Sequence, residues 1–198
     1  MAFFRAMHGL VIVVGVLAAI TYGICLDLVT TRVCIEYFTI GHIPIIASKD
    51  PNHLSLAWGV VATWWVGLAG GILIGLVGIK DGKLVGGFRA FIFNLLLLFS
   101  VTAVAAILMG IVGYYCALTG ICFVPPRFAR NVPLDAHPYF VSCIFAHSAS
   151  YVVSALGILL IAGACIAKRE RKSFNTKTQT PSFTKREIKY TQRFLRES

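Results

Sequence analysis

The sequence predicts an all-α protein, a bundle of four transmembrane helices with two longer loops on the outer face of the membrane. Composition is the first observation behind this prediction. Of the 198 residues, 58% are hydrophobic and only 13% are charged, whereas a soluble domain of this size carries about 25% charged residues. Mean hydropathy is +0.81. This apolar excess is hard to bury in one soluble core, so we expect a single domain whose solvent is a lipid bilayer.

Four long apolar runs are the second observation. Each supplies the ~20 residues that a helix needs to cross ~30 Å of hydrocarbon. None contains Asp, Glu or Lys, and backbone groups in lipid must be satisfied within the segment, so each run is expected to be helical. The first has no small-residue cleavage site and is expected to remain as a helix. The predicted spans are about 9–26, 54–79, 88–113 and 139–167, which together form a membrane domain over residues 1–167.

The distribution of Lys and Arg predicts the orientation. Fourteen of the 18 fall on one side: Arg5, Lys80, Lys83 and Arg89, and ten in the tail. Only four lie in the two long loops. By the positive-inside rule both termini are then cytoplasmic, and the net charge of +10 is mainly a topology signal.

The tail, residues 168–198, is strongly basic and is expected to be disordered and attracted to anionic lipid headgroups. It contains ten cations and three anions. Nucleic-acid binding would require a basic surface with base-stacking aromatic residues, and the tail offers little of that. No nucleic-acid partner is therefore predicted.

Small residues recur every four positions in each predicted span. This spacing lines one helical face and lets backbones approach closely in lipid. It predicts a tight bundle, or a bundle that also forms a homo-oligomer or binds a membrane-protein partner. The faces are Gly15, Ala19 and Gly23; Gly67, Gly71 and Gly75; Thr102, Ala106 and Gly110; and Ala146, Ser150 and Ser154.

Polar and ionisable residues gather toward the outer side of the predicted bundle. Asp27 lies where hydrocarbon meets water and needs a partner, and His147 inside the fourth span is a functional-site hypothesis by default. If the first helix continues outward, Arg32 and Glu36 become i,i+4 neighbours that can form an ion pair. The full candidate cluster is Asp27, Arg32, Glu36, His42, Asn94, Asp135, His137, His147 and Tyr151.

Two interpretations of this cluster remain open. In the first, Glu36, His42, His137 and His147 converge as ligands of a transition metal such as zinc, iron or manganese. However, no two histidines share helical i,i+3 or i,i+4 spacing, and ~15 Å of helix separates His137 from His147. In the second, His147 hydrogen-bonds across the bundle, to Asn94 or a serine, and the loop charges hold the loops.

Three of the six cysteines, Cys34, Cys116 and Cys122, lie in or beside the outer loops. Under the predicted topology they face an oxidising compartment, where disulfides form. A bridge between Cys116 and Cys122 would close a short loop, and a bridge from Cys34 to either of them is the alternative.

The run RVCIEYFTIGH at residues 32–42, followed by AWG at 57–59 and ATWW at 62–65, resembles a pattern in uncharacterised bacterial multi-pass membrane proteins. The likeness covers the first loop and the second span, under a quarter of the chain. It implies a bacterial cytoplasmic membrane and carries no activity.

Two function classes follow from the sequence. The first, which the pattern favours, is a non-enzymatic membrane subunit or assembly factor. The second is a membrane-embedded metal-binding protein or enzyme with a site at the outer face.

Overall fold

The computed structural model describes the backbone of residues 2–178 and the side chains of residues 6–171. Four helices dominate it and confirm the predicted all-α bundle. By length and composition each can cross a membrane: Ala6–Val33, Pro51–Gly78, Gly87–Leu118 and Leu134–Arg171. The elements in order are α1 (Ala2–Val33), α2 (Ile35–Thr39), α3 (Pro51–Gly78), β1 (Ile79–Lys80), β2 (Lys83–Leu84), α4 (Gly87–Leu118), α5 (Pro126–Ala129), a 3-10 turn η1 (Leu134–Ala136) and α6 (His137–Thr178).

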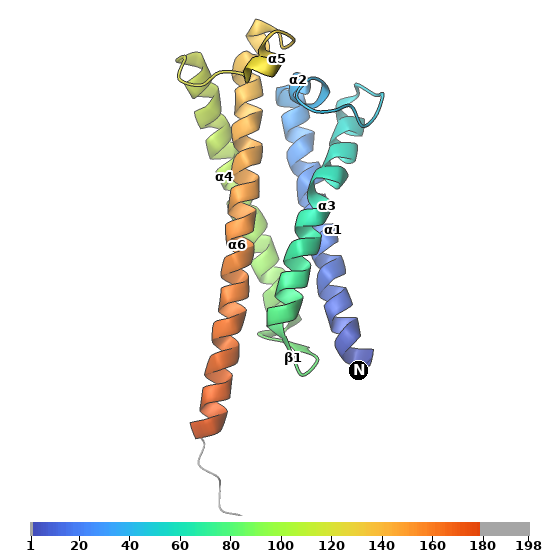
Figure 1. Ribbon diagram of the computed structural model, residues 1–198, viewed down its shortest axis with the longest axis vertical. Coiled ribbons are helices and arrows are strands. Elements are labelled where there is room, and N and C mark those ends of the chain that lie inside the picture. Colours follow the sequence, from blue (N-terminus) through green and yellow to red (C-terminus); the bar gives the residue numbers. More distant parts are fainter. Residues whose placement is uncertain (1, 179–198) are drawn as a thin grey trace, which may run out of the picture.

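The two ends of the bundle differ. One end, the cap end, carries α2 and α5 within the two long connections, and the other, the hairpin end, carries the short β1–β2 hairpin (Figure 1). The hairpin pairs Ile79 with Leu84 and turns through Asp81 and Gly82, both at positive φ. An Asp-Gly pair suits such a tight turn because Gly adopts positive φ without steric cost.

The helices extend beyond the apolar runs that marked them in the sequence. Apolar residues mark only the hydrocarbon-crossing part, whereas a helix continues for as long as its backbone can be satisfied. α6 runs to Thr178, so residues 168–178 are helical rather than disordered as expected. Residues 168–172 are Lys, Arg and Glu, which are good helix formers and favour the start of this continuation. The remainder of the predicted tail, 179–198, lies outside the described residues.

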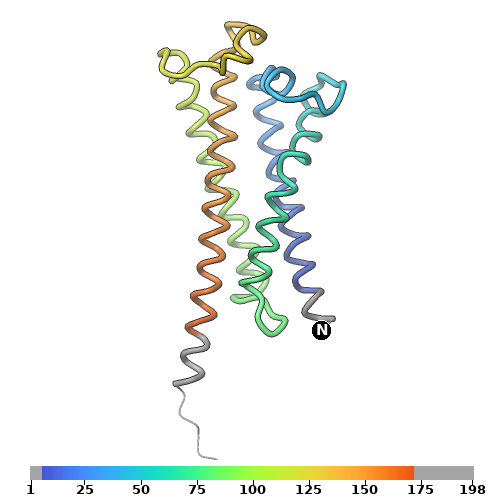
Figure 2. The backbone as a smooth tube through the Cα atoms, in the orientation of Figure 1, coloured from blue at the N-terminus to red at the C-terminus, as the bar shows by residue number. Residues whose placement is uncertain are grey.

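The four long helices form two pairs. α1 packs most extensively on α3, and α4 packs most extensively on α6 (Figure 2). Backbone-to-backbone contact makes the α1–α3 seam. A Cβ atom added at Gly59 would lie 2.6 Å from the Ile24 Cα, and one at Gly67 would lie 2.5 Å from the Gly15 carbonyl oxygen. The glycine faces predicted for these two spans therefore meet each other.

The α4–α6 seam uses small side chains as well as glycine. Thr102, Ala106 and Gly110 are buried on α4. A Cβ atom added at Gly110 would lie 3.4 Å from the Ser142 hydroxyl oxygen. Small residues on both helices thus allow α4 and α6 to pack closely, again as the four-residue spacing predicts.

The two pairs meet through two apolar clusters near the ends of the bundle. The cluster toward the hairpin end contains Val11, Ile74, Ile79, Leu84, Phe91 and Leu95. The cluster at the cap end contains Cys34, Val124, Val132, Phe140, Val141 and Cys143. The polar residues of the candidate site lie between these clusters, just below the cap.

Candidate functional site

His147 of α6 faces two polar residues of α1. Its Nε2 atom lies 3.1 Å from the Thr30 hydroxyl oxygen and 3.7 Å from Asp27 Oδ1. Asp27 and Thr30 are three residues apart and therefore share one helical face. Both are buried, at 3% and 5% exposed. The Thr30 hydroxyl donates to the Leu26 carbonyl, so its oxygen accepts from His147 Nε2. The structure thus brings the two candidate residues Asp27 and His147 together.

Aromatic rings close this polar cluster on the cap side. The chain leaves α1 at Cys34, whose extended backbone (φ −154°, ψ 101°) lets α2 turn across the end of the bundle. Tyr37 then stacks on the His147 ring with centroids 4.9 Å apart, and Phe38 meets it edge-on at 5.9 Å. Burial raises the pKa of the Tyr37 phenol above its ordinary value. Water is therefore kept away from the His147 side chain at this end.

His42 lies in the same aromatic layer but has different polar partners. Its Nδ1 atom is 2.7 Å from the Tyr37 carbonyl oxygen, and its ring packs on Trp58 at 4.6 Å. A hydrogen bond to a carbonyl five residues back is typical of a side chain that closes a turn. His42 therefore fastens the loop after α2 against α3.

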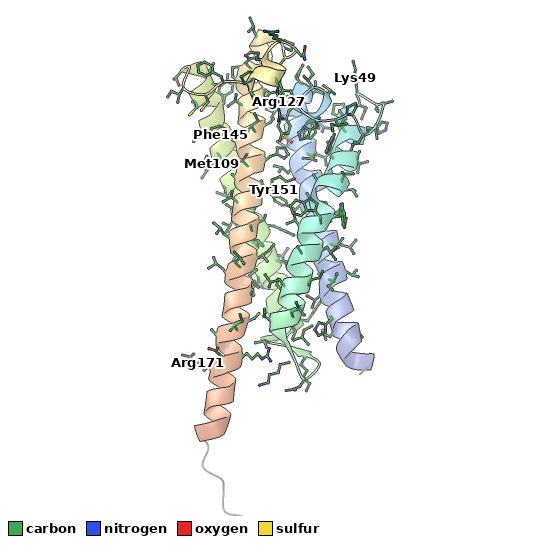
Figure 3. The ribbon with its side chains drawn as sticks, viewed as in Figure 1. Lys49, Met109, Arg127, Phe145, Tyr151 and Arg171 are labelled. Atoms are coloured by element: carbon green, nitrogen blue, oxygen red, sulfur yellow. The ribbon has the colours of Figure 1, made fainter. Side chains whose placement is uncertain are left out.

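Further polar contacts tie the helices together around His147. Thr31 and Ser55, both buried, place their hydroxyl oxygens 3.0 Å apart and join α1 to α3. The Tyr22 hydroxyl lies 3.2 Å from Ser150 Oγ, which joins α1 to α6. Tyr151 extends from α6 toward α3 (Figure 3) and donates to the Ala62 carbonyl at 3.2 Å. Of these, only Tyr151 was among the predicted site residues.

The predicted ion pair between Arg32 and Glu36 is wrong. Arg32 donates instead to the Leu28 carbonyl and to Asn52 Oδ1, each at 2.6 Å. Glu36 accepts a hydrogen bond from the Cys34 thiol at 3.4 Å. The physical reason is the helix end at Val33, which removes the i,i+4 relation on which the prediction depended.

Asn94 does not face His147. It lies one turn beyond Leu98, and Leu98 packs where Gly157 stands on α6, ten residues from His147. Ten helical residues correspond to ~15 Å. The predicted cross-bundle bond from His147 to Asn94 is therefore replaced by the bond to Thr30.

The two remaining candidates, His137 and Asp135, lie in the connection before α6 at the cap end. His137 places Nε2 3.1 Å from the Val132 carbonyl oxygen and so braces the loop before α6. Asp135 is exposed in η1.

The structure does not assemble the predicted metal ligands Glu36, His42, His137 and His147. Within residues 6–171, no three His, Cys, Asp or Glu side chains lie close enough together to hold a metal ion. His42 and His137 are each bonded to a backbone carbonyl oxygen, and Glu36 lies beside Cys34. The residues lie at one end of the bundle, as expected, but they do not converge.

All six cysteines are free thiols in the structure, so neither predicted disulfide is formed there. The Cys122 N–H nevertheless donates to the Cys116 carbonyl oxygen at 3.0 Å, and burial together with the neighbouring Cys116 thiol raises the pKa of Cys122. Cys34 is buried in the cap-end cluster, and this burial raises the pKa of its thiol to about 12. Cys34 therefore stays protonated and unreactive at neutral pH.

A cavity of about 70 Å³ lies between the helix pairs next to this cluster. Its polar lining comes from Tyr22, Asp27, Thr63, His147, Ser150, Tyr151 and Ser154, and apolar residues of all four long helices provide the rest. A cavity of this volume holds a few water-sized molecules. It is too small for an organic substrate, for which pockets of roughly 300 Å³ or more are typical.

The fold and this buried cluster define the class: a polytopic integral membrane protein with four spans. The chain matches no protein-family model, no curated protein and no solved structure.

Proposed function

We propose that this protein is a non-enzymatic membrane subunit or assembly factor, in which the buried polar cluster fastens the two helix pairs to each other. The observation that carries the proposal is the direction of the His147 side chain. It faces Thr30 and Asp27 on the other helix pair, with Nε2 3.1 Å and 3.7 Å from them. In this arrangement the imidazole links α6 to α1 through polar contacts, and we call such a link a joint between helices.

The energetic scale agrees with such a role. Interhelical hydrogen bonds in membranes contribute about 0.6 kcal/mol each on average and up to ~1.7 kcal/mol. Contacts of this kind from His147, Tyr22 and Tyr151 connect α6 with α1 and α3. Together they supply a few kcal/mol where direct packing between the pairs is sparse. The small cavity and the dispersed histidines offer no comparable support for an enzyme or a metal centre.

We also propose that the hairpin end is cytoplasmic, in a bacterial cytoplasmic membrane, with anionic headgroups facing the basic segment that begins at Lys168. Lys49 and Arg127 lie at the cap end, and Arg171 lies at the opposite end (Figure 3). Among the described side chains, six cations lie near the hairpin end and four near the cap end: Lys80, Lys83, Arg89, Lys168, Arg169 and Arg171 against Arg32, Lys49, Arg127 and Arg130.

Reporter fusions test this orientation. A green fluorescent protein fused after Ser198 is expected to fluoresce, because it folds to its fluorescent form in the cytoplasm. Alkaline phosphatase fused after Lys49 is expected to be active, because it requires an oxidising compartment. The opposite pattern at both positions would invert the topology.

The subunit role is tested by the size of the particle extracted from native membranes in a mild detergent. We expect a particle that exceeds the 21.6 kDa chain plus its detergent, both of which are measured by light scattering. Two variants separate a joint from a reacting group. His147→Gln keeps a donor near the position of Nε2 and is expected to preserve the particle, whereas His147→Leu is expected to reduce its yield.

Two results would sink the proposal. One is a particle that is monomeric in every extract. The other is a His147→Gln protein that assembles and melts like the wild type but loses a cellular function that the wild-type chain restores to a deletion strain.

A further inference from the structure

A deep groove runs along the side of the bundle between α1 and α4. Its volume is about 940 Å³. Residues 21–33 of α1 and 99–115 of α4 form its walls, and Ser142, Cys143 and Ala146 of α6 form its floor. The groove exists because α1 pairs with α3 and α4 pairs with α6, so α1 and α4 diverge toward the cap end. Most of its lining surface is apolar.

The groove is closed at its deep end. There the rings of Tyr22 and Phe99 stack with centroids 5.4 Å apart, and the Tyr22 hydroxyl is held by Ser150. From Thr21 to Val33 the α1 wall spans thirteen residues, and the twelve steps between them cover ~18 Å at the rise of an α-helix. This length matches one leaflet of a bilayer, about half of ~30 Å.

The closed end decides between two kinds of occupant. A partner transmembrane helix crosses the whole bilayer and would need a face that continues past Tyr22 and Phe99. A hydrocarbon chain that enters from one leaflet ends within the membrane and needs only the cap-side half. The observed length therefore favours a single chain of a lipid.

The open end of the groove carries phenol groups. Tyr114 packs against Tyr139 at 5.2 Å and against Tyr115 at 5.6 Å, and all three line the groove. Tyrosine is enriched at the headgroup level, because its ring is apolar and its hydroxyl is polar. The mouth thus has the chemistry to meet the ester and headgroup region of an amphiphile.

The groove also reaches the polar cluster. Thr30 lines its wall and is bonded to His147 on the far side. It lies three residues, or ~4.5 Å, below the end of α1. This is the depth at which an ester carbonyl would lie if the hydrocarbon chain filled the groove below it.

We propose that this groove binds one acyl chain of a diacyl glycerophospholipid from the cap-side leaflet, as a stoichiometric ligand. The tail extends down to the Tyr22–Phe99 stack, and the ester region lies beside Thr30 and the three tyrosines. This site is independent of the subunit role, which would stand if the groove were empty.

Native mass spectrometry of the full chain tests the site. The protein is exchanged into nanodiscs of equimolar phosphatidylcholine and phosphatidylglycerol and then released into detergent. We expect one phospholipid per chain to survive release. The Ala103→Phe variant fills the groove from α4 and is expected to lower the retained lipid by about tenfold or more, since added volume in a packed site is strongly unfavourable.

Two further variants control the experiment. Val104→Phe places the same ring one residue away on the exposed, lipid-facing side of α4, where Val104 is 56% exposed, and is expected to retain lipid as the wild type does. Cys25→Phe fills the groove from α1 and repeats the test if Ala103→Phe does not fold, as judged by circular dichroism and melting.

Three outcomes would overturn the proposal. Equal retention by wild type, Ala103→Phe and Val104→Phe would identify only bulk lipid. A wild-type dimer that Ala103→Phe dissociates would assign the groove to a second copy of this chain. Wild-type protein that retains no phospholipid would show that the groove is not a lipid site.

Discussion

The α1–α3 seam and the contacts between the two helix pairs are built in different ways. Along α1–α3 the backbones touch, with Gly15 against Gly67 and Gly59 against Ile24. Between the pairs, side chains reach across a wider space: His147 to Thr30, Tyr22 to Ser150 and Tyr151 to Ala62. The first seam depends on the absence of side chains and the second depends on polar side chains.

This difference follows from the solvent. In lipid, apolar surfaces gain little by leaving the bilayer for a helix interface, so helices associate through van der Waals contact or through hydrogen bonds. Close backbone contact yields many small attractions but tolerates no added atom. Longer polar contacts tolerate substitution better, and they leave room for a cavity and a groove. We therefore expect mutations to be most costly along α1–α3.

The largest effect is expected for Gly59→Ala. The new Cβ would lie 2.6 Å from the backbone of Ile24, so α1 and α3 must separate. Overpacking of this kind typically costs 1–3 kcal/mol, and backbone cannot rotate away, so we expect a loss near the upper end, ~3 kcal/mol. Unfolding in detergent, followed by circular dichroism, measures it.

Gly9→Ala on α1 and Gly163→Ala on α6 are matched controls, since nothing lies within 4 Å of either added Cβ. Both are expected to unfold at or slightly above the wild-type midpoint, because Ala favours helix over Gly. If Gly59→Ala were as stable as these controls, the close α1–α3 seam would be wrong.

An intermediate effect is expected for His147→Leu, which removes the main polar joint between the pairs. It leaves Asp27 buried without its partner, so we expect a loss of about 1–3 kcal/mol, more than the ~0.6 kcal/mol of an average interhelical bond. His147→Gln is expected to lose less. The double variant His147→Leu with Asp27→Leu is expected to be more stable than His147→Leu alone, because no buried polar group is then left without a partner. A double variant whose loss equals the sum of the two single losses would show that Asp27 and His147 do not interact.

Much of this architecture could be predicted from the sequence, because the information is local. The four spans follow from runs of apolar residues, and the packing faces follow from four-residue spacing such as Gly67, Gly71 and Gly75. The hairpin turn follows from Asp81-Gly82. Each prediction needs only the residues within one helix or one turn.

The partners of the candidate site could not be predicted in the same way. Asp27 and His147 are 120 positions apart, and which helices pair, and at what rotation, is not written in either segment. Thr30 and Thr31 carried a usable signal, since with Asp27 they form a polar stripe on an apolar helix. The helix end at Val33 carried none, because neither Gly nor Pro follows it, and so Arg32 and Glu36 were wrongly paired.

A smaller effect, dependent on pH, is expected at the cap end of the α1–α3 seam. Asp50 caps α3 by accepting hydrogen bonds from the backbone N–H groups of Asn52 and His53, at 2.8 and 3.2 Å. These bonds, that from His53 first, lower the pKa of the Asp50 carboxyl below its ordinary value of 3.8. Its stabilisation is therefore complete above that ordinary pKa, and it is lost as the pH falls through the lower pKa of the folded state.

Melting curves between pH 7 and pH 2 measure this contribution. Asp50→Ala is expected to melt a few degrees lower at pH 7, with the difference from wild type shrinking in acid. Asp50→Asn keeps a good N-cap without a titrating carboxyl, so it is expected to stay close to wild type at pH 7 and to lack this acid-dependent component. Equal acid sensitivity in all three proteins would show that the Asp50 N-cap does not contribute to the pH dependence of stability.

The smallest effect is expected for Tyr22→Phe, which tests whether the contacts between the pairs are distributed over several residues. The variant loses the 3.2 Å contact with Ser150 but keeps the ring that stacks on Phe99. Ser150 still donates to the Ala146 carbonyl at 2.9 Å, so no buried group is left without a partner. We expect a loss of ~0.6 kcal/mol, the average for an interhelical bond in lipid.

Tyr22→Ala provides the contrast, because it removes the ring as well as the hydroxyl. It opens the closed end of the α1–α4 groove toward the cavity beside Asp27 and is expected to cost several-fold more than Tyr22→Phe. If Tyr22→Phe were instead as costly as His147→Leu, the joint between the pairs would depend on two equal polar anchors. The two helix pairs would then be held together equally by the Tyr22 and His147 hydrogen bonds, and His147 would no longer be the main polar contact between them.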